Sequence, residues 1–376
     1  MPQQIAVYVH IPFCPSKCGY CDFNSYAMSG DIMESTTAAI IAEIERSPWT
    51  GIPAKTIFFG GGTPTFIPPE QLVRILEAVV RAHPPVTDAE ITSEANPGTV
   101  DMAKFRRMRE AGFNRISLGA QSFKDDDLLR LGRVHRSGEI EQAFGAARDA
   151  GFENINLDLM FALPGQSSRA WHENLRRVIE LRPEHLSLYC LTLEPNTPFY
   201  KQHLHGQLVL PDDEAQVAMY EDAVVFAQSA GYLQYEISNF AQPGFECRHN
   251  LCYWRGEDYA GYGPGAVGCM TNFSDSSNLA RHRYTNLKHP ERYCAAIAAN
   301  EEVAFESESL TEANARMEQI MLGIRLNEGL CLAGMEIEAK AMDRVVRRGW
   351  VSTSGGRAKL TPEGRHFCSE VALEFI

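Results

Sequence analysis

The sequence has 376 residues, which at about 150 residues per domain is enough for one large domain and one or two small ones. Lys and Arg number 35 against 48 Asp and Glu, so the formal net charge is −13. Such an acidic chain disfavours a general nucleic-acid or anionic-membrane surface. Its apolar runs, such as residues 38–42, are far shorter than the roughly 18 residues of a bilayer span. We therefore expect no nucleic-acid partner and no stable membrane insertion.

The N-terminus has neither a positively charged region nor a small-residue cleavage pattern, so we expect no secretory signal and predict a cytoplasmic protein. That compartment keeps thiols reduced, which disfavours disulfides. The ten cysteines therefore need another explanation, and metal ligation and burial are the two that remain.

Residues 1–238 alternate short β-rich runs with amphipathic helical stretches, the pattern of βα units around a parallel sheet. The word Ala-Gly-aromatic recurs at 111–113, 150–152 and 230–232, where the glycine ends a helix before a strand. The fold class predicted is therefore α/β, a partial (β/α)6-type barrel. The predicted strands cover residues 5–10, 56–59, 89–94, 115–118, 154–159 and 185–189, with a weaker seventh at 233–237.

The rest of the chain divides into two further segments. Residues 239–302 are rich in Gly, Asn, Tyr, His and Cys, which predicts irregular structure laid over the barrel. Residues 303–376 contain two helical stretches and two β-rich runs separated by Gly355 and Gly356, the order of a small winged-helix-like unit. Seven basic against six acidic residues after position 332 give a DNA-reading role weak electrostatic support.

Three cysteines follow the first predicted strand in a C-x3-C-x2-C run, Cys14, Cys18 and Cys21. A structural zinc site needs four ligands, and no fourth Cys or His stands nearby at the usual spacing. Three thiolates on one short loop suit an iron–sulfur cube with one open iron. The run therefore favours a 4Fe–4S cluster over zinc.

This run, after the first strand of a partial α/β barrel, resembles the radical S-adenosylmethionine (SAM) superfamily. The words from Tyr8 to Cys14 and from Cys21 to Asn24 resemble one branch of it, the oxygen-independent coproporphyrinogen III dehydrogenases and the HemW heme chaperones. The resemblance implies a 4Fe–4S cluster on the three cysteines, whose open iron binds SAM.

Further motifs stand where the other predicted strands end. Gly61, Gly62 and Thr63 follow the second strand in a glycine run that lacks the Gly-Lys-Ser/Thr of a phosphate loop. Polar residues close the third, fourth and fifth strands, and each taken singly could be a capping or core residue. Together they converge on the C-terminal rim, where (β/α) barrels build their sites. The resemblance implies SAM contacts for Tyr8, Tyr20, Gly61, Gly62, Thr63, Glu94, Gln121, Arg133 and Asp158.

Two features separate the members of that branch. The dehydrogenases have a further Cys two residues after the third, where this chain has Phe23. The stretch from His249 to Trp254 matches the His-Asn-x-x-Tyr-Trp word of the HemW group. Because an imidazole can ligate heme iron when it is deprotonated, we predict His249 as the heme ligand, with Cys247 and Cys252 as alternatives.

The resemblance implies a heme chaperone that binds heme, a 4Fe–4S cluster and SAM and passes the heme to an acceptor protein, a respiratory hemoprotein being one candidate. The alternative is an oxygen-independent coproporphyrinogen III dehydrogenase. A third hypothesis is a regulator whose C-terminal unit binds DNA.

Overall fold

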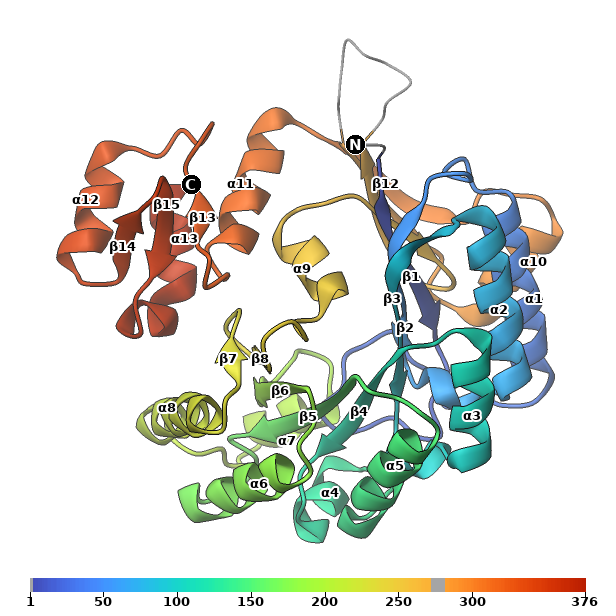
Figure 1. The fold of residues 1–376 in the computed structure, drawn as a ribbon, viewed down its shortest axis with the longest axis horizontal. Coiled ribbons are helices and arrows are strands. Elements are labelled where there is room, and N and C mark those ends of the chain that lie inside the picture. The colour runs from blue at the N-terminus through green and yellow to red at the C-terminus, as the bar shows by residue number, and fades with distance from the viewer. Residues whose placement is uncertain (1–2, 272–280) are drawn as a thin grey trace.

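The structure is a computed structural model that describes residues 3–271 and 281–376. A curved open sheet runs through it, with the strand order β12-β11-β10-β9-β1-β2-β3-β4-β5-β6-β8-β7 (Figure 1). Its six central strands are parallel and confirm the six predicted strands. They are β1 (Ile5–Ile11), β2 (Ala54–Gly61), β3 (Pro85–Ala95), β4 (Arg115–Gln121), β5 (Ile155–Phe161) and β6 (His185–Cys190).

Side-chain alternation gives this sheet two different faces. Residues such as Val7, Ile57 and Leu157 are fully buried in the main hydrophobic core, which also includes apolar side chains of the flanking helices. The residues between them face the concave side, and they include polar residues such as Ser117 and Asp158 as well as Phe58 and Met160. A parallel barrel strand has this pattern because consecutive side chains point to opposite faces.

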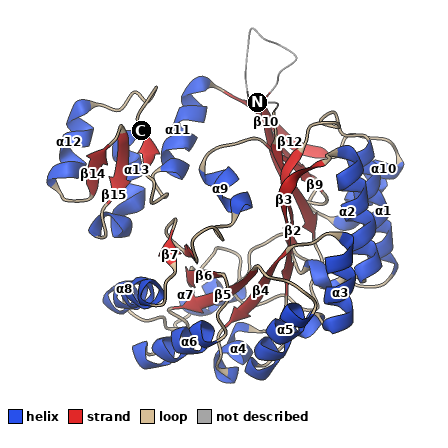
Figure 2. Ribbon diagram, in the orientation of Figure 1, coloured by secondary structure: helices blue, strands red, loops and turns tan. Residues whose placement is uncertain are grey.

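Helices cover the convex face of the sheet (Figure 2). Most follow a barrel strand, and neighbouring pairs such as α1 with α2 and α6 with α8 pack together. They are α1 (Asp31–Glu45), α2 (Pro69–Ala82), α3 (Met102–Ala111), α4 (Asp125–Leu131), α5 (Ser137–Asp149), α6 (Ser168–Glu180) and α8 (Asp213–Ser229). Helix α7 (Pro198–Leu204) instead packs on the loop after β1, where the Phe199 N–H donates to the Gly19 carbonyl at 2.9 Å.

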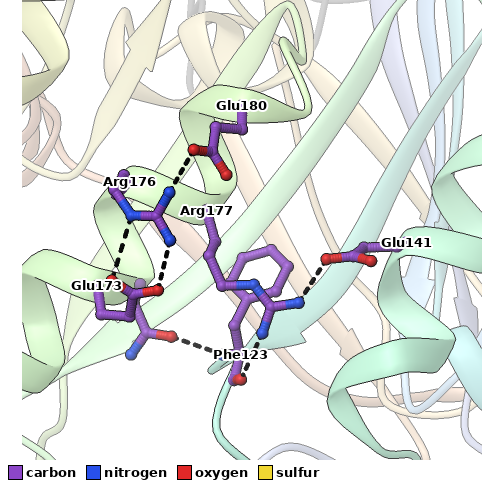
Figure 3. A network of polar contacts seen from close by, with 7 residues as sticks. Phe123, Glu141, Glu173, Arg176, Arg177 and Glu180 are labelled. Atoms are coloured by element: carbon purple, nitrogen blue, oxygen red, sulfur yellow. Dashed lines mark hydrogen bonds and ion pairs between the residues drawn. The ribbon is translucent and has the colours of Figure 1, made fainter.

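Charged side chains hold two of these helices together on the outside. Arg177 of α6 bonds to Glu141 of α5 and donates to the Phe123 carbonyl at 3.0 Å, with its guanidinium 4.9 Å from the Phe123 ring (Figure 3). Exposed ion pairs of this kind each contribute little to stability. These contacts lie in the outer layer, away from the concave face.

The predicted seventh strand at 233–237 is wrong in length and direction. β7 (Leu233–Gln234) has two residues and pairs antiparallel with β8 (Asn239–Ala241). The chain turns between them because the Glu236 carboxylate accepts from the Ser238 N–H at 2.9 Å and from the Asn239 side-chain amide at 2.5 Å. A local side-chain turn therefore replaces the extended run that the sequence suggested.

The expectation of irregular structure over residues 239–302 is also wrong in large part. Strand β9 pairs parallel to β1, and the strands after it extend the sheet antiparallel. Glycines that suggested loops instead permit close strand packing, since a Cβ on Gly268 would lie 2.2 Å from the Tyr284 ring. The segment contains α9 (Arg248–Trp254), β9 (Tyr259–Tyr262), β10 (Val267–Thr271), β11 (Arg281–Asn286) and α10 (Pro290–Ala298), followed by β12 (Ala304–Leu310).

The C-terminal unit forms a second hydrophobic core with a three-stranded antiparallel sheet, β13-β15-β14. The alternation of helices and strands is the winged-helix-like order that the sequence predicts. Ile237 of the barrel packs against this core, and the Asn327 N–H donates to the Tyr235 carbonyl at 2.9 Å. The elements are α11 (Glu312–Gly323), β13 (Leu330–Cys331), α12 (Ala339–Arg347), β14 (Val351–Ser354), β15 (Arg357–Leu360) and α13 (Cys368–Phe375). The boundaries at 238 and 302 stay predictions.

Candidate functional site

The cysteine loop leaves β1 and folds back on itself. The Cys14 N–H donates to the Tyr26 carbonyl at 3.0 Å, and the Cys21 N–H donates to the Cys18 carbonyl at 3.3 Å. All three thiols are free and half-buried. Burial raises the pKa of the Cys14 and Cys21 thiols. A cation at this loop would favour their thiolate forms, which are the forms that ligate metals.

The glycine turn after β2 packs directly on the start of this loop. The Thr63 N–H donates to the Phe13 carbonyl at 2.7 Å, and the Thr63 hydroxyl lies 3.4 Å from the Cys14 sulfur. A Cβ on Gly62 would lie 2.6 Å from that same carbonyl oxygen, and Gly61 has a φ of +112°. Glycine is therefore required at both positions. The turn places backbone N–H groups beside the cysteines.

Two carboxylates face the space in front of the turn. Glu94, at the end of β3, accepts from the Gly61 N–H at 3.2 Å. Burial, with repulsion from nearby Asp158, raises the pKa of Glu94 to about 8. The Asp158 carboxylate accepts from the Asn156 amide at 2.7 Å and from the Ser117 hydroxyl at 3.2 Å. Burial raises the pKa of Asp158 as well. Two partly desolvated acids side by side favour a cationic ligand.

Arg133 supplies positive charge on the cysteine side. Its guanidinium donates to the Gly119 carbonyl at 2.8 Å, bonds to the Asn96 side chain and lies 3.8 Å from the Cys18 sulfur. The Asn96 amide in turn donates to the Thr63 hydroxyl at 2.9 Å. Arg133, Asn96 and Thr63 thus form one connected frame around the cysteines.

Two adjoining cavities occupy the concave side. One is lined by the cysteines, the glycine turn and the predicted rim residues, namely Cys14, Cys18, Tyr20, Cys21, Gly61, Gly62, Thr63, Glu94, Gln121, Arg133 and Asp158. The other, of about 320 Å³, shares Tyr20, Cys21, Glu94, Gln121 and Asp158 with it and extends to the floor of the barrel. Gln121 has a φ of +63°, a strained backbone of the kind that collects at binding sites.

This donor set fits a 4Fe–4S cluster with SAM. The loop offers three free thiols, with the Arg133 guanidinium beside one of them. The same cavity is lined by the glycine turn and by two carboxylates, which suit a ligand that has an amine and a sulfonium. Among the described residues no three His, Cys, Asp or Glu side chains lie close enough to hold a single metal ion.

Two predicted residues lie outside the lining of both cavities. Tyr8 bonds to the His10 ring at 3.0 Å and stacks on Phe58. His249 is 1% exposed, with Nδ1 2.8 Å from the Thr56 hydroxyl and Nε2 2.9 Å from the Tyr253 hydroxyl. Both ring nitrogens of His249 therefore have partners. Heme ligation by His249 stays a prediction, and it would require breaking one of these hydrogen bonds.

The remaining residues of the His-Asn-x-x-Tyr-Trp word belong to α9, which lies on the concave side of the sheet (Figure 2). The Glu90 carboxylate accepts from the N–H groups of Arg248 and His249, each at 3.0 Å, and so holds the first turn of α9. Cys247 and Asn250 line the larger cavity, but Cys252 does not. Of the three heme ligands considered, only Cys247 thus faces that cavity.

Several cavity residues were not predicted. Asn96, Arg115, Asn156 and Tyr189 all line the two cavities. Arg115, Ser117 and Gln121 share the inner face of β4 by simple alternation, which is the signal that could have found Arg115.

Comparisons with known proteins agree with this geometry. A model of the radical SAM superfamily matches residues 8–178. The chain is 37% identical over 386 residues to the heme chaperone HemW of Escherichia coli K12, covering 99% of this chain and 98% of that protein. The chain belongs to the HemW family. A HemW protein of Bacillus subtilis is 36% identical over 383 residues, and 99% of each chain is covered.

A further relative comes from an animal, and a solved structure has a similar fold. A mitochondrial radical S-adenosyl methionine domain-containing protein 1 of Danio rerio is 34% identical, over 87% of this chain and 74% of that protein. The structure of coproporphyrinogen III oxidase (HemN) of Escherichia coli has a TM-score of 0.82 and 22% identity, covering 99% of this chain and 89% of that one. The predicted fold class and family are therefore confirmed, and the radical SAM family implies SAM and a 4Fe–4S cluster. No helix among the described residues is long and apolar enough to cross a membrane.

Proposed function

We propose that this member of the HemW family is a heme chaperone. In this proposal Cys14, Cys18 and Cys21 hold a 4Fe–4S cluster, SAM binds beside it, and the chain carries one heme to an acceptor protein. A respiratory hemoprotein is our candidate acceptor. We further propose that the chain works in the cytoplasm, where its ten free cysteines would stay reduced. The observation that carries the proposal is the match to HemW proteins over 99% of the chain.

The residues of the smaller cavity support the assignment of SAM. Glu94 and Asp158 would attract its cationic groups, and the glycine turn, which has no side chains at Gly61 and Gly62, would let its methionine end approach the backbone closely. Arg133, Gln121 and Tyr20 line the same space. When bound and reduced, a 4Fe–4S cluster supplies the electron that cleaves SAM in radical SAM chemistry. Whether this chain uses that step for heme release is separate from the binding roles of its residues.

The larger cavity supports a porphyrin cargo. Its walls include Phe58, Met160, Tyr189 and Leu191, which offer a flat apolar ligand contact on its faces. Phe23, at the position where the dehydrogenases have a further cysteine, is 64% exposed and lines the mouth of both cavities. The chain therefore lacks one thiol of the enzyme signature at the site itself.

A single preparation tests the proposal. The protein is purified without oxygen, loaded with iron and sulfide, and titrated with heme while optical spectra are recorded. SAM, a reductant and coproporphyrinogen III are then added, and decarboxylated product is measured. We expect a stoichiometric Soret band and no decarboxylated product. Turnover of the porphyrinogen without stable heme binding would instead identify a dehydrogenase.

The Cys18→Ala variant separates the two cofactors in the same assay. We expect it to lose the cluster absorbance and keep heme binding, because Cys18 lines only the smaller of the two cavities. Loss of both signals would show that the cluster and the heme depend on one structural unit.

A further inference from the structure

The floor of the larger cavity contains a buried charge with no protein partner. Arg115 is the first residue of β4, and its side chain is 2% exposed and lines this cavity. Among the residues that the structure describes, its Nε has no hydrogen-bond partner. Across residues 3–271 and 281–376, no carboxylate forms an ion pair with its guanidinium.

The acids nearest to Arg115 are engaged elsewhere. Glu90 accepts the two N–H groups that begin α9, at 3.0 Å each. Asp158 accepts from Asn156 and Ser117. Burial disfavours the charge of Arg115, but these acids and Cys247 outweigh that effect and keep its pKa above the usual value. The guanidinium is therefore charged, desolvated and unpaired.

The guanidinium is charged, but its buried Nε–H donor has no acceptor within the described part of the chain, so the desolvation penalty of that donor is uncompensated in the ligand-free fold. Such an arrangement is expected where a ligand supplies the missing partner. The planar fork of arginine matches a carboxylate in a bidentate fashion. Phe58, Met160 and Leu191 line the same cavity, and these apolar side chains suit the body of a ligand whose edge is anionic.

We propose that Arg115 anchors a propionate carboxylate of the porphyrin cargo at the floor of this cavity. This inference rests on the proposed function and deepens it, because it places the cargo in the larger cavity, between α9 and the SAM site. Asn156 and Asn250 line the same cavity and would add neutral hydrogen bonds.

The test compares Arg115→Met and Arg115→Gln with the wild type, all loaded with the cluster. The control is Arg109→Gln, an exposed arginine on the outer helix α3 that donates only to backbone carbonyls. Each protein is titrated with heme and with heme dimethyl ester, whose carboxylates are blocked. Thermal unfolding of the ligand-free proteins and SAM affinity are measured in parallel.

We expect both Arg115 variants to bind heme about 10- to 100-fold more weakly, the range for a lost hydrogen bond to a charged group. They should bind the diester as the wild type does, and Arg109→Gln should behave as the wild type throughout. Their ligand-free melting temperatures should stay close to that of the wild type, because the guanidinium forms no ion pair with the described residues and its Nε has no hydrogen-bond partner there. SAM affinity should not change.

The assignment would be overturned if the Arg115 variants bound heme as tightly as the wild type, or if they lost the diester equally. It would also be overturned if they melted well below the wild type, which indicates a structural role, or if SAM affinity fell while heme affinity was kept. A wild-type chain that binds no heme would instead overturn the proposed function itself.

Discussion

Glu94 should make SAM affinity depend on pH, and the structure sets the range. Burial in the barrel, with repulsion from Asp158, raises the pKa of Glu94 to about 8. Below that pH the side chain is mostly neutral and attracts a cation poorly. A cationic ligand selects the carboxylate form, so its affinity should rise with pH until Glu94 is ionised.

The magnitude follows from the ionised fraction of Glu94. With a pKa of about 8, that fraction is about 1% at pH 6 and about half at pH 8. SAM affinity of the wild type should therefore increase about 50-fold between these two values. Glu94→Gln removes the titrating group. Its SAM affinity should therefore be weaker than that of the wild type at pH 8 and should change little between pH 6 and pH 8.

Equilibrium binding of SAM to cluster-loaded protein at pH 6, 7 and 8 measures this effect. The wild type and Glu94→Gln are compared at each pH, because SAM's own amine titrates equally in both experiments. The reasoning is refuted if wild-type affinity is level between pH 6 and 8, or if Glu94→Gln keeps the same slope.

Three other predictions concern the glycine turn, a buried carboxylate of α1 and the buried His249. Gly62→Ala should lower the iron bound per chain after reconstitution, because its Cβ would lie 2.6 Å from the Phe13 carbonyl oxygen. The control Gly138→Ala has open space around the new Cβ and should bind iron as the wild type does. Glu43→Ala should destabilise the fold by about 3–5 kcal/mol in chemical denaturation, because Tyr293, Gly263 and Asn286 all donate to this carboxylate. Glu45→Ala is the surface control, and equal stability of the two variants would contradict the prediction. Burial, Arg115 and Lys55 lower the pKa of folded His249 to about 3, so the ring should stay neutral in the folded state above that pH. The unfolded histidine takes up a proton near pH 6.5. Stability should therefore fall as pH decreases below 6.5, by about 2 kcal/mol from this residue between pH 7 and 5, and a His249→Gln variant that keeps the full acid sensitivity of the wild type would count against it.

The barrel could be predicted from the sequence because its signals are local. The β-rich runs gave the six parallel strands, and the glycines that end helices before strands, such as Gly112 and Gly151, do have positive φ. The rim site followed from these strands, since parallel strands end at one edge. Glu94, Gln121 and Asp158 accordingly line one cavity with the cysteines.

The strands after β8, the orientation of His249 and the burial of Arg115 depend on contacts between residues far apart in the sequence, which local sequence patterns do not reveal. Residues 259–262 pair with β1, more than 200 positions earlier, and the glycines of this region permit the contact. The direction of the His249 ring is set by Thr56 and Tyr253, on β2 and α9. Arg115 stands at the start of a strand, where a charged residue suggests solvent exposure, yet its side chain is 2% exposed because the folded chain surrounds it.

Heme transfer is the measurement that tests the central claim most directly. The heme-loaded protein, with cluster, SAM and reductant, is mixed with membranes that contain a heme-free respiratory oxidase, and its Soret band is followed with oxidase activity. Passive heme loss is measured separately with excess apomyoglobin. We predict that oxidase activity appears as the Soret band of the chain declines, at a rate above passive loss. Transfer no faster than passive loss, or no gain of oxidase activity, would contradict the account.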